Sequence, residues 1–256
     1  MSQVQMVDRE QAKSRRVISE GKIRKVVDYF GGAAAAGGAQ AYLVEQKNYV
    51  TRAHFHPTDQ FQILLGAEGS LFGRRPVSAL EVHYADAYTV YGPLVGGDPP
   101  LRYFTLRATP TDVTEYMPEA RERRRERGGR SLSRRLEPTA RVALGQAVYS
   151  PLLDDDGHLG IAEINAGADA TVSVPASGPV GQFVFVVEGT LRWRDGSYGP
   201  ESVGWQPAGE PGFTGTAGPA GARLLTLRFR DRAGAETPDD GRDGPSAGLA
   251  EGRADD

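Results

Sequence analysis

The sequence predicts an all-β protein built from two tandem copies of one antiparallel β module. Short runs rich in Val, Leu, Phe, Tyr and Thr recur between turn residues along most of the chain, a pattern typical of a β-sandwich or barrel. The 33 glycines and 17 prolines among 256 residues follow no period, which suits turn-rich β structure rather than collagen. Stretches of the first half also recur, in the same order, in the second half.

The elements follow in chain order. Residues 1–28 carry mixed charge and are predicted to form a short helix and a lead-in strand, within an N-terminal extension of residues 1–40. The Gly/Ala run at 31–38 is predicted to be a flexible connection. Strands of the first module are expected at Ala41–Gln46, Tyr49–Phe55, Gln60–Leu65, Ala87–Tyr91 and Leu101–Arg107. Those of the second are expected at Gly160–Ile164, Gln182–Val187, Thr190–Arg194 and Arg223–Phe229. The tail, residues 232–256, has almost no bulky apolar residue and is predicted to be disordered.

The internal repeat defines how the modules correspond. Pro57, Gln60 and Phe61 recur as Pro179, Gln182 and Phe183, at an offset of 122 residues. Residues 68–71 match 188–191 at an offset of 120, and residues 102–107 match 223–228 at an offset of 121. Three matches at nearly one offset indicate a duplication. We therefore place one module at 41–110 and the other at 140–231.

Between the modules, residues 111–139 are rich in arginine. One interpretation is a phosphate-binding arm; the other is a solvated connector whose arginines pair with neighbours such as Glu122 and Glu126. Lys and Arg number 30 against 33 Asp and Glu, a formal net charge of −3. Because no wider basic field supports an arm, this balance favours the connector and predicts no nucleic-acid partner.

Composition also restricts the chemistry and the compartment. The chain has no cysteine, which excludes disulfides, thiolate metal ligands and cysteine nucleophiles. No apolar run has the length of a signal peptide core or a spanning helix, so we predict a cytoplasmic protein without a membrane partner. Imidazole chemistry rests on four histidines, at positions 54, 56, 83 and 158.

A pair of histidines, His54 and His56, is the strongest candidate for a chemical centre. Side chains two apart on a strand point to the same face, which Arg52 shares with both imidazoles. A following antiparallel strand from Gln60 would bring the side chain of Gln60 beside them, with Gln62 on the same face. Two imidazoles and a side-chain oxygen suit a divalent metal. The alternative is two imidazoles satisfied by hydrogen bonds in a polar interior.

These residues resemble the first motif of the cupins, which runs Gly, five residues, His-x-His, three or four residues, Glu, six residues, Gly. Asn48, His54-Phe55-His56, Gln60 and Gly69 stand at these positions, with Gly69 two residues later than the motif requires. The second cupin motif is matched by Ala85, Tyr91-Gly92-Pro93 and Gly96, without its histidine. The resemblance implies a bicupin, two jelly-roll barrels in one chain. Ala176 and Gly178 replace the histidine pair in the second barrel, which therefore lacks the metal ligands.

From the residues and the resemblance together we predict a metal site and a substrate site in the first barrel. His54, His56 and Gln60 would hold Fe, Zn, Ni or Mn, and Gln62, Arg52, Tyr91 and Tyr103 would contact the substrate. The resemblance implies a homodimer that acts on a small organic molecule, in the manner of a dioxygenase, isomerase or cyclase. The alternative is a non-catalytic binding or sensory bicupin, and the metal content of the purified protein discriminates between the two.

Overall fold

A computed structural model describes residues 3–19, 22–31, 38–77, 79–124, 129–155 and 159–231. Within these ranges the chain forms 21 β-strands and one short 3-10 helix, η1 (Arg121–Arg123), which confirms the all-β class. No helical segment in the described part has the length and apolar character that a bilayer span requires. The predicted tail, His158 and most of the Gly/Ala run lie outside the described residues.

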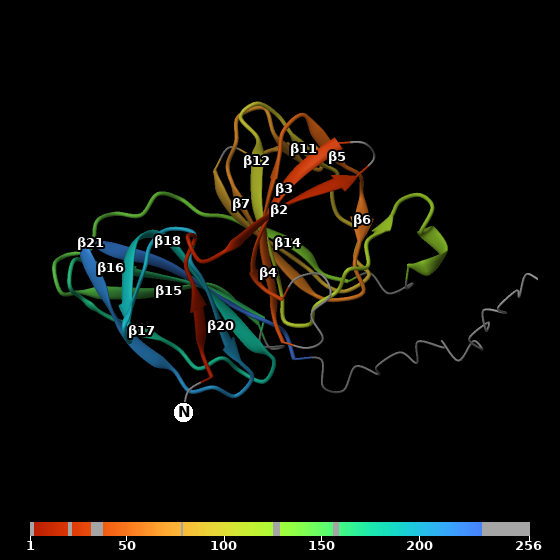
Figure 1. Ribbon diagram of the computed structural model, residues 1–256. Coiled ribbons are helices and arrows are strands. Elements are labelled where there is room, and N and C mark those ends of the chain that lie inside the picture. The colour runs from red at the N-terminus through yellow and green to blue at the C-terminus, as the bar shows by residue number, and fades with distance from the viewer. Residues whose placement is uncertain are drawn as a thin grey trace, which may run out of the picture.

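The first half of the molecule, residues 13–136, contains three antiparallel sheets (Figure 1). Its seven-stranded sheet has the order β14 (Ser131–Arg135), β10 (Leu80–Ala85), β7 (Gln60–Leu65), β12 (Leu101–Arg107), β4 (Gln40–Gln46), β3 (Lys22–Phe30) and β2 (Lys13–Ser19). A four-stranded sheet has the order β5 (Tyr49–Thr51), β11 (Leu94–Gly96), β8 (Leu71–Phe72) and β9 (Arg75–Pro76). The smallest sheet pairs β13 (Glu115–Tyr116) with β6 (His54–Phe55).

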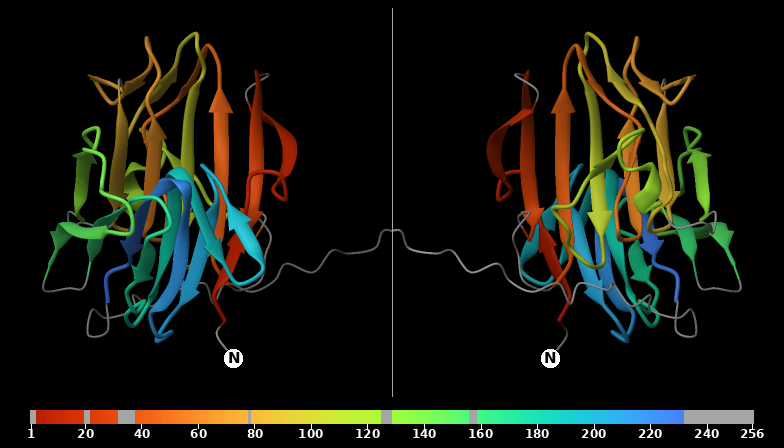
Figure 2. Two further views of the ribbon diagram at one scale, coloured as in Figure 1. Left: turned by 90° about the vertical axis from the view of Figure 1, so that its left-hand side faces the viewer. Right: turned by 90° about the vertical axis from the view of Figure 1, so that its right-hand side faces the viewer.

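The second half, residues 3–7 and 141–231, is built on one eight-stranded sheet. Its order is β1 (Gln5–Val7), β20 (Val203–Pro207), β18 (Gly181–Trp193), β21 (Phe213–Arg228), β16 (Gly160–Ala166) and β15 (Ala147–Asp154). In addition, β17 (Thr171–Val174) pairs with β21, and β19 (Gly196–Tyr198) pairs with β18. Views turned by 90° show the two halves stacked, the first above the second (Figure 2).

The two halves repeat one strand order. In the first half β10, β7, β12 and β4 are successive neighbours, and in the second half β20, β18, β21 and β16 are. The sequence repeat falls on these strands, since Gln60 and Gln182 lie on β7 and β18, and Arg107 and Arg228 end β12 and β21. The duplication seen in the sequence therefore corresponds to a shared topology.

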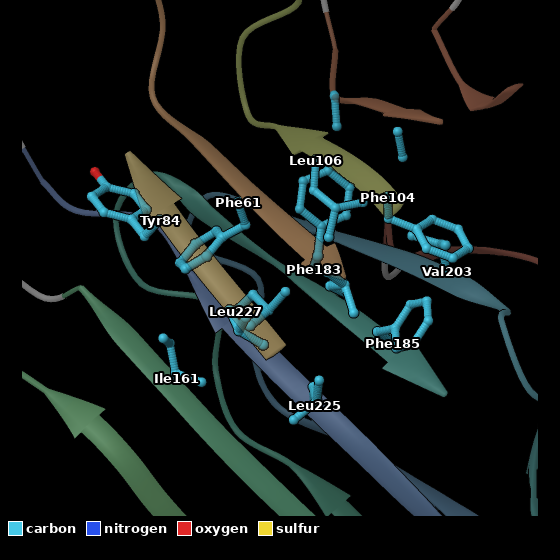
Figure 3. Close-up of a cluster of buried hydrophobic side chains, with 14 of the residues drawn as sticks. Phe61, Tyr84, Phe104, Leu106, Ile161, Phe183, Phe185, Val203, Leu225 and Leu227 are labelled. Carbon is cyan, nitrogen blue, oxygen red and sulfur yellow. The ribbon is translucent and has the colours of Figure 1, made fainter. Parts of the chain in front are cut away.

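An apolar core joins the halves (Figure 3). Alternate residues of the seven-stranded sheet, among them Phe61 and Phe104, pack against Phe183, Phe185 and Leu227 of the eight-stranded sheet. The rings of Phe104 and Phe185 meet edge to face, with centroids 4.8 Å apart. Because this face of the first sheet is buried between the halves, its opposite face is left for the interior of the first half.

Two predicted elements are wrong. Described residues of the N-terminal segment form β1, β2 and β3 instead of a helix, because Val26, Val27 and Tyr29 bury themselves in a sheet beside β4. The run Ala87–Tyr91 forms only an isolated bridge between Tyr91 and His54. Tyr88 has a left-handed φ of 63°, which ends regular extension, and the true strand is β10 just before it.

The arginine-rich segment contributes to the first half. Its β13 pairs with β6 and its β14 pairs with β10. Among its described arginines, Arg123 forms an ion pair of 2.6 Å with Glu115. Pairing with glutamates agrees with the connector interpretation for this part of the segment.

Candidate functional site

A polar cavity of about 150 Å³ lies in the first half, on the inner face of the seven-stranded sheet. Strand alternation explains one side of the cavity. Tyr103, Thr105 and Arg107 lie two apart along β12, so their side chains point to the same face, and all three line the cavity. The other lining residues come from β2, β3, β4, β5 to β7, the loop between β10 and β11 that holds Tyr91, and the segment that ends in β13: Arg15, Val17, Arg24, Val26, Gln40, Tyr42, Val44, Thr51, His54, His56, Gln62, Tyr91, Thr111, Asp112, Thr114 and Tyr116.

Both predicted histidines reach the cavity in a defined tautomer. His54 Nδ1 lies 2.7 Å from the carbonyl oxygen of Arg52, and His56 Nδ1 lies 2.6 Å from that of Val113. A carbonyl only accepts hydrogen bonds, so each Nδ1 carries the proton and each Nε2 carries a lone pair. Tyr91 donates its hydroxyl to His56 Nε2 at 3.1 Å. His54 Nε2 has no hydrogen-bond partner among the described residues.

Burial keeps these imidazoles neutral. Burial, with a smaller effect from the positive charges of Arg107 and Arg24, lowers the pKa of His54 to about 4. The pKa of His56 is also well below its usual range, again through burial and then Arg107. Both rings are therefore neutral hydrogen-bond acceptors near neutral pH, and only a nearby negative charge would raise their basicity.

The two predicted tyrosines also line the cavity and are protonated. Burial raises the pKa of Tyr91 and Tyr103 far above the usual value, so both present hydroxyl groups. The ring of Tyr91 packs on that of His54 with centroids 4.4 Å apart. Tyr91 thus contacts both imidazoles, as a packing surface for His54 and a hydrogen-bond donor to His56.

Gln60 holds an arginine rather than facing the histidines. Its Oε1 accepts two hydrogen bonds from Arg107, from Nε at 3.2 Å and Nη2 at 3.1 Å. Arg107 Nη1 donates to Gln40 Oε1 at 2.7 Å and to the carbonyl oxygen of Thr111 at 3.0 Å. Arg107 is only 2% exposed, and all of these partners are uncharged oxygens. A buried guanidinium thus lies beside the cavity without a carboxylate partner in the described part of the chain.

The remaining predicted residues separate into two environments. Gln62 lines the cavity, and its buried Oε1 has no partner among the described residues. The guanidinium of Arg52 instead pairs with Glu119, with Nη1 2.8 Å from Oε1. Arg52 lies between β5 and β6, where the strand is interrupted, so the alternation that would place it with the histidines does not apply.

Sequence reasoning missed two arginines that line the cavity with the histidine pair, Arg107 and Arg24. Arg107 carried a usable signal: it closes the repeated segment at 102–107 and lies two residues from Thr105 on one strand face. Arg24 stands two residues before Val26 on β3, and both line the cavity. The predicted lead-in strand had no assigned bounds or faces, so that spacing was not used.

The predicted metal can be tested against these donors. Gln60 Oε1 is bound by Arg107, and His56 Nε2 is bound by Tyr91, which leaves one uncommitted donor of the predicted three. No group of three His, Cys, Asp or Glu side chains suited to a metal occurs among the described residues. Two guanidinium groups line the same cavity and oppose a cation. These residues, as arranged, do not fit a resident divalent metal.

Neither a protein-family model nor a curated protein matches the sequence. Solved structures do. A protein from Nostoc punctiforme, whose name proposes a dioxygenase, is 12% identical, with a TM-score of 0.64 over 91% of this chain and 84% of that one. A bacterial pirin from Escherichia coli in complex with nickel(II) is 11% identical, with a TM-score of 0.50 over 89% of this chain and 100% of that one.

A cupin 2 conserved barrel domain protein from Leptotrichia buccalis is 13% identical, with a TM-score of 0.51 over 83% of this chain and 92% of that one. Together these likenesses show that the chain has a cupin fold. At such low identity they show the fold alone, so the chemistry has to be argued from the cavity.

Proposed function

We propose that the chain is a cupin-fold protein that acts on a small organic carboxylate held by Arg107 in the cavity of the first half. The observation that carries this proposal is the burial of Arg107 among uncharged partners. A buried charge is costly unless it is compensated by an opposite charge. Four of the five guanidinium N–H groups already bond Gln60, Gln40 and Thr111, so a bound carboxylate would compensate the charge through the remaining Nη2–H.

His54 supplies chemistry beside that anchor. Its uncommitted Nε2 can accept a proton from a carbon or hydroxyl group of the bound carboxylate once the negative charge of that carboxylate offsets the arginine charges that hold the pKa of His54 at about 4. An N–H bond forms, the substrate bond to hydrogen breaks, and the electron pair stays on the substrate. Arg107 stabilises the negative charge that develops there. Tyr91 keeps the neighbouring imidazole, His56, from competing, because its hydroxyl occupies Nε2.

The first experiment measures carboxylate binding by isothermal titration calorimetry. Arg107→Met is expected to weaken binding about 100-fold, because truncating one partner of a buried charge pair costs about 2–5 kcal/mol. Arg228→Met, at the matched position of the second half, is the control and should bind as wild type does. Equal binding by wild type and Arg107→Met would refute the proposal.

A second experiment separates the enzyme from the binding or sensory alternative. Exchange of the α-hydrogens of a bound carboxylate with deuterium oxide is followed by NMR. The enzyme should accelerate exchange, and His54→Gln should remove the acceleration while leaving binding in place. Binding without any acceleration would favour the non-catalytic alternative.

A divalent metal at His54 and His56 is the second candidate, and it would require Tyr91 to release His56 Nε2. What favours it is the tautomer of both rings, whose Nδ1–H groups are fixed on backbone carbonyls so that Nε2 is the ligating atom. Metal analysis of protein purified without an affinity tag tests it. One Fe, Zn, Ni or Mn per chain that disappears in the His54→Ala/His56→Ala double variant would establish this candidate over the metal-free one.

The organisation of the molecule is proposed with the function. We propose that the two halves are two cupin barrels built on the modules predicted at 41–110 and 140–231, with β2, β3 and β14 added to the sheet of the first and β1 to that of the second. A homodimer in the cytoplasm remains our prediction, to be measured by light scattering and cell fractionation.

A further inference from the structure

A second arginine of the cavity, Arg24, has the same lack of a carboxylate partner as Arg107. Its buried Nε forms no hydrogen bond in the described part of the chain, and its guanidinium lies over the ring of Tyr49, 5.0 Å from the centroid. Arg24 forms no ion pair with a described residue. The cavity therefore contains two guanidinium groups that lack compensating charge.

The other charged groups of the cavity wall do not supply that charge. Arg15 also lines the cavity, but it pairs with Asp28, with Nε 2.5 Å from Oδ2. Asp112, the one carboxylate among the lining residues, forms no ion pair with either free arginine. One negative group against two unpaired positive groups leaves room for further negative charge on a ligand.

His54 lies within the electrostatic reach of both arginines, since Arg107 and Arg24 each lower its pKa. His54, the proposed proton acceptor, therefore lies in the positive electrostatic field of Arg107 and Arg24. Size limits what can bridge them, because an engineered cavity of about 150 Å³ in another protein holds benzene. A ligand of about six to eight non-hydrogen atoms fits that limit.

We infer that the ligand is a short dicarboxylate of three or four carbons, with one carboxylate on Arg107 and the other on Arg24. This inference rests on the proposed function, which requires only the carboxylate on Arg107. It adds a specificity-determining role for Arg24. Opposite charges placed in this way favour the dianion and reject neutral analogues.

The test compares acetate, malonate, succinate and inorganic phosphate by isothermal titration calorimetry. We expect wild type to bind malonate or succinate at least tenfold more tightly than acetate. Arg24→Met should remove this preference without changing the affinity for acetate. Arg15→Met is the matched control, an arginine of the same cavity already paired with a carboxylate, and should keep the preference.

The outcomes separate this inference from the proposed function. Acetate binding as tightly as the dicarboxylates, tighter binding of phosphate than of either, or a preference that survives Arg24→Met would overturn the inference alone. Circular dichroism of each variant checks that it is folded, and Arg24→Lys should recover part of the preference in a folded protein. If no anion requires Arg107, the proposed function itself fails.

Discussion

The two halves repeat one topology and differ at matched positions of their interiors. Where the first half has His56, the second has Gly178, and a Cβ there would lie 3.0 Å from Arg228 Cδ. Arg228, the counterpart of Arg107, thus occupies space next to the lost imidazole. It also has a carboxylate partner, since its Nη2 lies 2.5 Å from Asp154 Oδ1.

The glutamines differ in the same sense. Gln60 turns its oxygen to Arg107, whereas Gln182 donates to Pro175 and Gln206 in a network without charge, each at 2.8 Å. One half therefore leaves a buried cation uncompensated beside a cavity, and the other pairs the equivalent cation. Under the proposed function, the first half kept a binding site, while the second kept mainly the fold.

Acidification should produce the largest effect, and it should originate in the first half. His54, His56 and His83 are buried there with lowered pKa values, about 4 for His54 and His83. Unfolded histidines have a pKa of about 6.5, so between these two values the unfolded chain binds more protons than the folded chain. Stability therefore decreases as the pH is lowered. From pH 7 to pH 5 the loss is about 2 kcal/mol each for His54 and His83, and His56 adds a loss of the same sign.

Urea unfolding at both pH values, followed by circular dichroism, measures this loss. His83→Gln is the matched variant, since His83 lies outside the cavity lining with Nδ1 bound to Ser133. It should reduce the loss between pH 7 and pH 5 by about 2 kcal/mol, the contribution of His83 alone. A pH dependence unchanged in that variant would contradict the assignment.

The next prediction concerns Gln60, which stands at the glutamate position of the cupin motif. Gln60→Glu places a carboxylate against Arg107, which then resembles the paired Arg228 of the second half. We expect carboxylate binding to weaken about 100-fold, as the internal ion pair competes with the ligand. Calorimetry checks this, with Gln182→Glu as the matched control. Unchanged affinity in Gln60→Glu would mean that the ligand does not bind at Arg107.

Features of the site set by residues close together in the sequence could be predicted, whereas features set by the pairing of distant strands could not. Alternation along one strand places His54 and His56 correctly, and the repeat predicts the corresponding strands of the two halves. Arg107 and Arg24 reach the cavity from β12 and β3, and only the sheet order brings them to the histidines. Arg52 shows the limit of alternation, because the chain leaves the strand at that residue. The helix prediction failed because the segment owes its extended form to pairing with β4.

The smallest effect is expected in the second half. Asp154→Asn removes the carboxylate from Arg228, and Asp154 is 63% exposed in its side chain, so water replaces much of the lost interaction. Exposed ion pairs contribute about 0–1 kcal/mol, and the free energy of unfolding should fall by no more than that.

The same substitution also asks whether an unpaired arginine is sufficient to make an anion site. We expect it is not, because Arg228 packs on Gly178 and the second half has no imidazole at the matched positions. Calorimetry of Asp154→Asn in the Arg107→Met background should therefore show no carboxylate binding. Recovered binding would show that charge pairing alone distinguishes the halves, and that the histidines of the first half are not needed to hold the anion.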